Sequence, residues 1–163
     1  MPDRENGLQR ATFAAGCFWG VEEAFLEAKG VRSTSVGYTG GRLPNPTYED
    51  VCFRDTGHAE AVEVCFDPSE VSFEELLALF WEIHDPTTLN RQGPDLGAQY
   101  RSGIFYHSAE QEAAARRSLE ALEHAGIWRR PIVTEITPAA AFYPAEAYHQ
   151  QYLRKMGIAS CHI

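Results

Sequence analysis

The chain has 163 residues, 44% hydrophobic and 23% charged, a composition typical of one ordinary domain with a core of two or more layers. Its formal net charge of −9 argues against nucleic acid as a partner, and it lacks the run of about 18 apolar residues that a membrane helix needs. The amino terminus also lacks the apolar segment of a signal peptide. We therefore expect a single domain over residues 1–163, located in the cytoplasm and binding neither nucleic acid nor membranes.

Hydrophobic periodicity predicts alternating strands and helices. Strands are expected at residues 11–15, 31–37, 59–66, 99–107 and 132–136, and helices at residues 21–28, 72–85, 108–124 and 144–156. Residues 38–46 and 87–97 are predicted to be loops, residues 47–50 one helical turn, and residues 157–163 a mobile tail. This order predicts an α+β fold, a two-layer α/β sandwich with a ferredoxin-like (βαββαβ) core, to which the C-terminal helix and tail are added.

The stretch Gly16-Cys17-Phe18-Trp19-Gly20 lies between the first predicted strand and the first predicted helix. A thiol at a helix start is stabilised as thiolate, so we expect the pKa of Cys17 to fall below the usual value of about 8.5. Phe18 and Trp19 place two large apolar side chains beside it. The pattern indicates a reactive thiolate next to an aromatic wall, although a buried cysteine at a tight turn gives the same local sequence.

Glu60 is the second informative residue, because it shares a strand face with Val62, Val64 and Phe66. A carboxyl group on the core face has a raised pKa and keeps its proton near neutral pH, which suits a general acid. The alternative is a glutamate at the strand end that reaches solvent.

Three further polar residues lie in or beside predicted loops: Tyr48, Asp95 and Tyr100. Phenols in such places can donate hydrogen bonds to a substrate oxygen, although most tyrosines only pack. The histidines lack metal-ligand spacing with the four cysteines, so no metal site is expected. Four cysteines without a Cys-x-x-Cys pair are too sparse for a disulfide scaffold.

Several motifs together resemble the peptide methionine sulfoxide reductases of type A. The resemblance covers residues 12–161 and rests on Gly16-Cys17-Phe18-Trp19-Gly20, Gly57-His58-Ala59-Glu60-Ala61-Val62, His84-Asp85-Pro86-Thr87, Asn90-Arg91-Gln92-Gly93, Asp95-Leu96-Gly97-Ala98-Gln99-Tyr100-Arg101-Ser102 and Ala147-Tyr148-His149-Gln150-Gln151-Tyr152-Leu153.

The resemblance implies reduction of methionine S-sulfoxide, free or in oxidised proteins. Cys17 would attack the sulfoxide sulfur while the methyl group rests against Phe18 and Trp19. Glu60 would protonate the sulfoxide oxygen, Tyr48 and Tyr100 would hydrogen-bond it, and Asp95 would help to place this network. The sulfenic acid left on Cys17 would condense with a second cysteine, and thioredoxin would reduce the disulfide, without metal or organic cofactor.

The tail departs from the family's common form, because Ala159-Ser160-Cys161-His162-Ile163 offers one tail cysteine and no Gly-Tyr-Cys. We expect Cys161 to be the resolving cysteine, with Cys52 and Cys65 as the alternatives. Pro94 before Asp95 is a smaller departure that could alter the loop.

Two interpretations from other classes stay open. A cysteine hydrolase would pair Cys17 with His58, His84 or His149 and would need an oxyanion hole. A binding module would hold oxidised methionine against Phe18 and Trp19 without consuming thiol.

Overall fold

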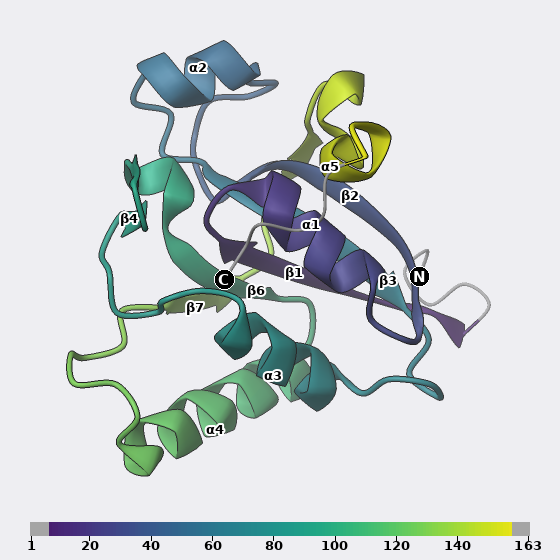
Figure 1. The fold of residues 1–163 in the computed structure, drawn as a ribbon, viewed down its shortest axis with the longest axis vertical. Coiled ribbons are helices and arrows are strands. Elements are labelled where there is room, and N and C mark those ends of the chain that lie inside the picture. Colours follow the sequence, from purple (N-terminus) through teal and green to yellow (C-terminus); the bar gives the residue numbers. More distant parts are fainter. Residues whose placement is uncertain (1–6, 158–163) are drawn as a thin grey trace.

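The computed structural model describes residues 7–157, which form a mixed α/β fold around a curled six-stranded sheet (Figure 1). Its strands are β1 (Gln9–Ala15), β2 (Val31–Thr39), β3 (Ala59–Phe66), β6 (Ser102–Tyr106), β7 (Glu135–Pro138) and β8 (Phe142–Pro144). The helices are α1 (Phe18–Leu26), α2 (Tyr48–Phe53), α3 (Phe73–Glu82), α4 (Ala109–Ala125) and α5 (Tyr152–Lys155). A separate small hairpin consists of β4 (Arg91–Gln92) and β5 (Asp95–Leu96).

The sheet has the strand order β7-β6-β1-β3-β2-β8. Neighbouring strands are antiparallel from β6 to β8, whereas β7 joins β6 in parallel. Because β1 is hydrogen-bonded to β3 on one side and to β6 on the other, its last residues are held firmly. The turn that follows β1 therefore starts from a fixed point.

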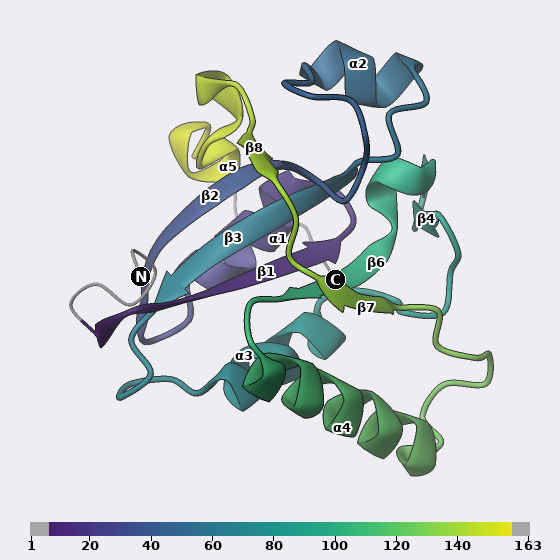
Figure 2. The ribbon, with the colours of Figure 1, turned by 180° about the vertical axis from the view of Figure 1, so that it is seen from behind.

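Helices α1 and α3 cover one face of the sheet: they lie in front of it in Figure 1, and the sheet lies in front of α1 in Figure 2. The ring of Phe13 in β1 stacks on Phe25 of α1 and Phe80 of α3, with centroids 5.0 and 5.3 Å apart. All three side chains are fully buried, so aromatic packing fixes both helices on the central strand.

The predicted mixture of strands and helices is confirmed, but the last predicted helix is wrong. Residues 142–144 form β8, Ala147–His149 is one 3₁₀ turn, and α5 has only four residues. The interruption is at Gln151, whose φ of 52° lies in the left-handed region. Its backbone N–H donates to the buried carboxylate of Glu22 at 2.7 Å, a tertiary contact that outweighs local helix propensity.

Other boundaries also differ from the prediction. Strand β2 continues to Thr39, because Tyr38, expected in a loop, is fully buried in the sheet. The loop expected at residues 87–97 contains β4 and β5, and the strand expected at residues 132–136 lies at Glu135–Pro138. The first helix begins at Phe18 rather than Val21.

The expected tail, apart from Gly157, lies outside the described residues, and so does Cys161. Between residues 7 and 157, no helix has the length and apolar character needed to cross a membrane.

Candidate active site

Cys17 lies in the turn that joins β1 to α1. Gly16 has a φ of 99°, a backbone conformation that favours glycine, and it directs the chain out of the sheet. Cys17 is the N-cap residue of α1, so its side chain lies at the amino end of that helix. The residue is partly buried, and its sulfur faces the first backbone N–H groups of the helix.

Glu60 approaches this turn from β3. Its side chain is 2% exposed, and its Oε1 accepts a hydrogen bond from the backbone N–H of Phe18 at 3.2 Å. Burial is the main cause that raises the pKa of Glu60 from 4.5 to about 8; the charge of Asp95 adds to it and the Phe18 hydrogen bond opposes it. At neutral pH this carboxyl group therefore carries a proton, and it is hydrogen-bonded to the residue next to Cys17.

The pKa of Cys17 is raised to about 12, opposite to the direction expected from the helix start. Burial is the largest cause and the negative charge of Glu60 the second. Hydrogen bonds from the backbone N–H groups of Trp19 and Gly20 lower the pKa, as a helix amino terminus should, but they are outweighed. Because the contribution of Glu60 needs its ionised form, a protonated Glu60 makes the thiolate easier to form.

Three tyrosines lie around Glu60: Tyr38, Tyr48 and Tyr100. Burial is the main cause of a raised pKa in all three, and the charge of Glu60 contributes to each. The phenols therefore keep their protons near neutral pH and can donate hydrogen bonds. Tyr48 is the first residue of α2, and Tyr100 is the last residue of a 3₁₀ turn.

Tyr38 was missed by the sequence analysis. It lies opposite Glu60 in the β2–β3 register, and its hydroxyl donates to Glu146 Oε1 at 3.0 Å. Glu146 Oε2 also accepts from the backbone N–H of Tyr48 at 2.9 Å, so one carboxylate holds β2 and α2 together. The signal that could have found Tyr38 is its spacing of two from the buried Val36, which continues the strand pattern.

The C-terminal segment holds the aromatic wall in place. Trp19 Nε1 donates to His149 Nδ1 at 2.9 Å, and the Trp19 ring stacks on Tyr152 with centroids 3.9 Å apart. Phe18 is 1% exposed and lies 5.3 Å from the ring of His149, centroid to centroid. Burial lowers the pKa of His149, so its ring is neutral and accepts the indole hydrogen bond. The sequence analysis considered His149 only as a possible base.

The three histidines proposed for a hydrolase make other contacts. The Nδ1 of His58 accepts from Gly41 N at 3.0 Å, and its Nε2 lies 2.7 Å from Leu43 O. The ring of His84 contacts a backbone carbonyl and a serine hydroxyl, each at 2.7 Å. Since His149 is bound to Trp19, the geometry disfavours a Cys–His hydrolase. Residues 7–157 contain no group of three or more metal-ligating side chains placed to hold an ion.

Asp95 reaches the site from β5, and its charge raises the pKa of both Cys17 and Glu60. Of the predicted site residues, the structure thus brings together Cys17, Phe18, Trp19, Tyr48, Glu60, Asp95 and Tyr100. Of the two other thiols between residues 7 and 157, Cys52 of α2 lies beside the site, because it is hydrogen-bonded to the Tyr48 side chain and the charge of Glu60 helps to raise its pKa, whereas Cys65 lies in β3 within the sheet.

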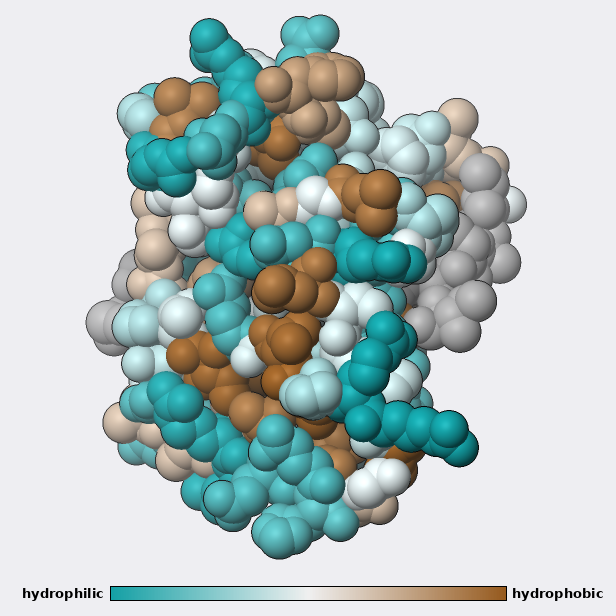
Figure 3. All heavy atoms as spheres, turned by 90° about the vertical axis from the view of Figure 1, so that its left-hand side faces the viewer, coloured by the Kyte–Doolittle hydropathy of each residue, from teal (hydrophilic) through white to brown (hydrophobic). Residues whose placement is uncertain are grey.

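Apolar side chains are exposed on elements that surround the site, among them Phe53 of α2 (84%) and Leu96 of β5 (69%). Figure 3, which faces the side of the molecule that bears α2 and β4, shows hydrophobic patches set among hydrophilic atoms.

Comparison with known proteins points to one family. The model of the family "Peptide methionine sulfoxide reductase" matches residues 9–163. Peptide methionine sulfoxide reductase MsrA of Methanosarcina acetivorans is 66% identical over 93% of this chain and 81% of its own length, and that of Geobacter sulfurreducens is 61% identical over 96% of both chains.

Solved structures agree with the sequence comparison. Reduced Mxr1 from Saccharomyces cerevisiae superposes with a TM-score of 0.87 at 38% identity, covering 96% of this chain and 91% of that one. Mxr1 in complex with Trx2 superposes with a TM-score of 0.62 at 29% identity, covering 89% and 84%. This chain therefore belongs to the peptide methionine sulfoxide reductase family, in its MsrA branch.

Proposed function

We propose that this chain reduces methionine S-sulfoxide, free or in oxidised proteins, to methionine, with Cys17 as the nucleophile and thioredoxin as the recycling reductant. The observation that carries the proposal is the buried Glu60, a carboxylic acid with a pKa of about 8 whose oxygen is hydrogen-bonded to the residue that follows Cys17. A proton donor and a thiol in one partly apolar site match what removal of oxygen from a sulfoxide requires.

In the first step the sulfur of Cys17 attacks the sulfoxide sulfur, and Glu60 donates its proton to the sulfoxide oxygen. The phenols of Tyr48 and Tyr100 donate hydrogen bonds to the same oxygen, and Asp95 helps to place these groups. The attack joins the two sulfurs; the oxygen then passes from the substrate sulfur to Cys17 as the S–O bond of the substrate and the transient S–S bond break, so methionine leaves and Cys17 is left as a sulfenic acid. The cysteine sulfur loses two electrons and the substrate sulfur gains them, so no other redox group takes part.

Phe18 and Trp19 form the apolar wall against which the substrate methyl group rests. Trp19 is fixed by its hydrogen bond to His149 and its stacking on Tyr152. A chiral sulfur whose methyl group meets this wall presents its oxygen to Glu60 in one configuration only, so the site takes one epimer, which we propose to be the S epimer.

Recycling requires a second thiol. Cys161 condenses with the sulfenic acid, releasing water and forming a Cys17–Cys161 disulfide that the dithiol of thioredoxin reduces. The structure titled as a complex of Mxr1 with Trx2 supports a thioredoxin as this partner. The net charge of −9 disfavours binding to the phosphate backbone of nucleic acid, and we place the chain in the cytoplasm, away from membranes, as part of this proposal.

For the fold, we infer a single domain whose four central strands and two helices follow the ferredoxin-like (βαββαβ) pattern. The order β6-β1-β3-β2 with antiparallel neighbours supports this description. The segment that joins β7 to β8, together with α5, is then an addition to that core.

The test of the function is methionine formation from purified methionine S-sulfoxide with dithiothreitol or thioredoxin as reductant. The proposal is supported if methionine forms in an amount equal to the enzyme without reductant and if turnover continues only when reductant is added. Ester hydrolysis without sulfoxide reduction supports a hydrolase, and binding without turnover supports a binding module.

A further inference from the structure

The hairpin that carries Asp95 is poorly anchored by apolar contacts. None of the residues 91–97 is buried, and Leu96, the large apolar side chain among them, is 69% exposed. Hydrophobic burial, which fixes most of this fold, therefore contributes little to where the hairpin lies. Polar contacts must decide its position.

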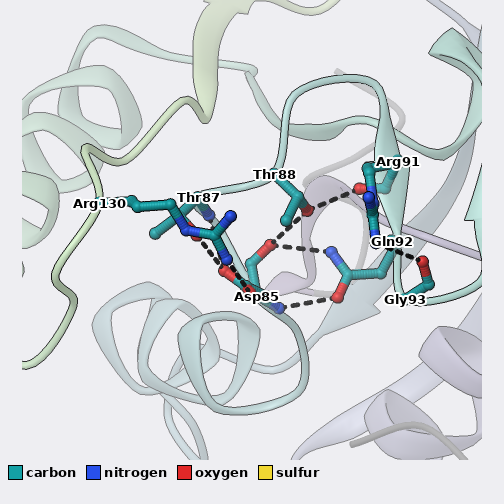
Figure 4. Close-up of polar contacts among 7 residues, drawn as sticks. All are labelled: Asp85, Thr87, Thr88, Arg91, Gln92, Gly93 and Arg130. Atoms are coloured by element: carbon teal, nitrogen blue, oxygen red, sulfur yellow. Dashed lines mark hydrogen bonds and ion pairs between the residues drawn. The ribbon is translucent and has the colours of Figure 1, made fainter.

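Gln92 supplies the side chain of the hairpin that attaches it to the end of α3. The Thr88 hydroxyl adds a link from outside, to Arg91 O at 2.8 Å and Asp85 O at 3.5 Å. The side-chain Oε1 of Gln92 accepts from Asp85 N at 2.9 Å, and its Nε2 donates to Asp85 O at 2.8 Å (Figure 4). One amide side chain thus satisfies both backbone groups of a single residue, as a neighbouring strand would.

Asp85 is itself a fixed point. It follows the buried His84 at the end of α3, and its Oδ1 accepts from the backbone N–H and the hydroxyl of Thr87 at 2.9 and 2.6 Å. The next residue, Pro86, accepts a hydrogen bond from Val133 N at 2.8 Å, which ties this turn to the segment before β7. Asp85 therefore fixes the position of Gln92 relative to the core.

The connection continues from Gln92 to Asp95, because these two residues are direct partners in the β4–β5 register. The carboxylate of Asp95 in turn acts on Cys17 and Glu60. A short chain of contacts thus runs from the end of α3 through Gln92 to the reacting groups.

We propose that Gln92 is a positioning residue of the sulfoxide reductase site: its side-chain amide, clamped to the backbone of Asp85, holds Asp95 beside Cys17 and Glu60. The proposal rests on the proposed function for its catalytic consequence, although the placement of Asp95 can be measured without turnover. Gln92 touches neither the substrate nor the reacting atoms and acts only through the hairpin.

The first measurement is the pH dependence of Cys17 alkylation by iodoacetamide, followed by mass spectrometry of the Cys17 peptide. The groups whose charge acts on Cys17 are Glu60 and Asp95, and the phenol of Tyr100 is coupled to it. Removing the Asp95 charge by Asp95→Asn lowers the pKa of Cys17 and speeds alkylation at pH 9 by at least about twofold. Gln92→Met, which keeps side-chain length but cannot clamp Asp85, shifts the alkylation profile in the same direction.

The second measurement is the rate of methionine formation in a single turnover. Gln92→Met lowers it about 10-fold or more, since displacement of a catalytic group by about 1 Å can cost about 10². Gln92→Glu keeps the acceptor for Asp85 N but loses the donor to Asp85 O, so its rate falls between those of Gln92→Met and the parent. Arg91→Met is the matched control, because Arg91 donates within the hairpin, to Gly93 O, and should stay within twofold of the parent.

The double variant Gln92→Met/Asp95→Asn separates positioning from general loosening. If Gln92 acts through Asp95, adding Gln92→Met to Asp95→Asn changes neither the alkylation profile nor the single-turnover rate further. If Gln92→Met keeps its full effect on the profile or the rate when Asp95 is already Asn, the proposal is overturned. A Gln92→Met enzyme with the parent's alkylation profile overturns it as well. A parent that alkylates as described but forms no methionine overturns the proposed function instead.

Discussion

Glu60→Gln should cost activity and add stability, and both effects follow from the burial of one carboxyl group. The unfolded chain binds the Glu60 proton with a pKa of 4.5, whereas the folded protein binds it with a pKa of about 8. Between these values the native state holds one proton more than the unfolded state, so the free energy of unfolding falls as pH rises, by about 1.4 kcal/mol per pH unit. Over the interval from pH 5 to pH 8 the parent therefore loses about 4 kcal/mol.

Glutamine removes this penalty, because it does not ionise. Its side-chain oxygen can still accept the hydrogen bond from Phe18 N, which Glu60 accepts at 3.2 Å. The variant should match the parent near pH 5 and exceed it by about 4 kcal/mol near pH 8, since the free energy of unfolding of the variant lacks the Glu60 contribution. Urea unfolding followed by tryptophan fluorescence at several pH values gives the two curves.

The catalytic effect has the opposite sign. An amide cannot give up a proton as a carboxylic acid does, so the single-turnover rate of methionine formation should fall about 10²–10⁴-fold. Glu63→Gln, on the same strand but three residues away, is the control and should keep the parent's rate. The reasoning about the buried acid would be refuted if the free energy of unfolding changed with pH in the same way in the parent and in Glu60→Gln. A single-turnover rate of Glu60→Gln within threefold of the parent's would also refute it.

Cys17→Ser should keep its fold by circular dichroism and lose turnover, because a hydroxyl is a poor nucleophile toward sulfur near neutral pH; residual activity above a few per cent contradicts this. The parent should reduce the S epimer and leave the R epimer untouched in assays on the purified epimers, and equal rates would exclude a chiral wall of Phe18 and Trp19. Tyr48→Phe and Tyr100→Phe should each lower the single-turnover rate by roughly 10-fold, the value of about 1.4 kcal/mol for one hydrogen bond to a developing charge; unchanged rates in both would remove the phenols from the mechanism.

The parts of the fold that sequence reasoning found are those with strong periodicity. The turn around Cys17 lies between a buried strand and a helix, and Glu60 shares a face with residues that are all buried, so their meeting could be expected. The two-residue strands β4 and β5 are too short to show any period. Their position depends on the contact between Gln92 and Asp85, which joins residues seven apart through a side chain.

The remaining errors have tertiary causes. The final helix is interrupted at Gln151 by its bond to Glu22, a residue 129 positions earlier. The pKa of Cys17 was expected to fall because local sequence shows the helix start, but the burial and the carboxylates that raise it are supplied by the folded chain. The sequence analysis placed Tyr38 in a loop because the Gly/Pro-rich stretch begins beside it. In the structure β2 continues through Tyr38, because Tyr38 pairs with Glu60 of the neighbouring strand β3.

The most direct test of the account is mass spectrometry of the Cys161→Ser enzyme after one equivalent of methionine S-sulfoxide, without reductant. We expect about one methionine per enzyme and a gain of one oxygen, about 16 Da, in the mass of the intact enzyme; a reagent that traps sulfenic acids should then label the peptide that contains Cys17. Thioredoxin should then fail to restore turnover, whereas dithiothreitol should restore part of it. Oxygen on another cysteine would contradict the assignment of Cys17 as nucleophile. A disulfide from Cys17 to Cys52 or Cys65, with thioredoxin turnover intact, would contradict the assignment of Cys161 as resolving cysteine.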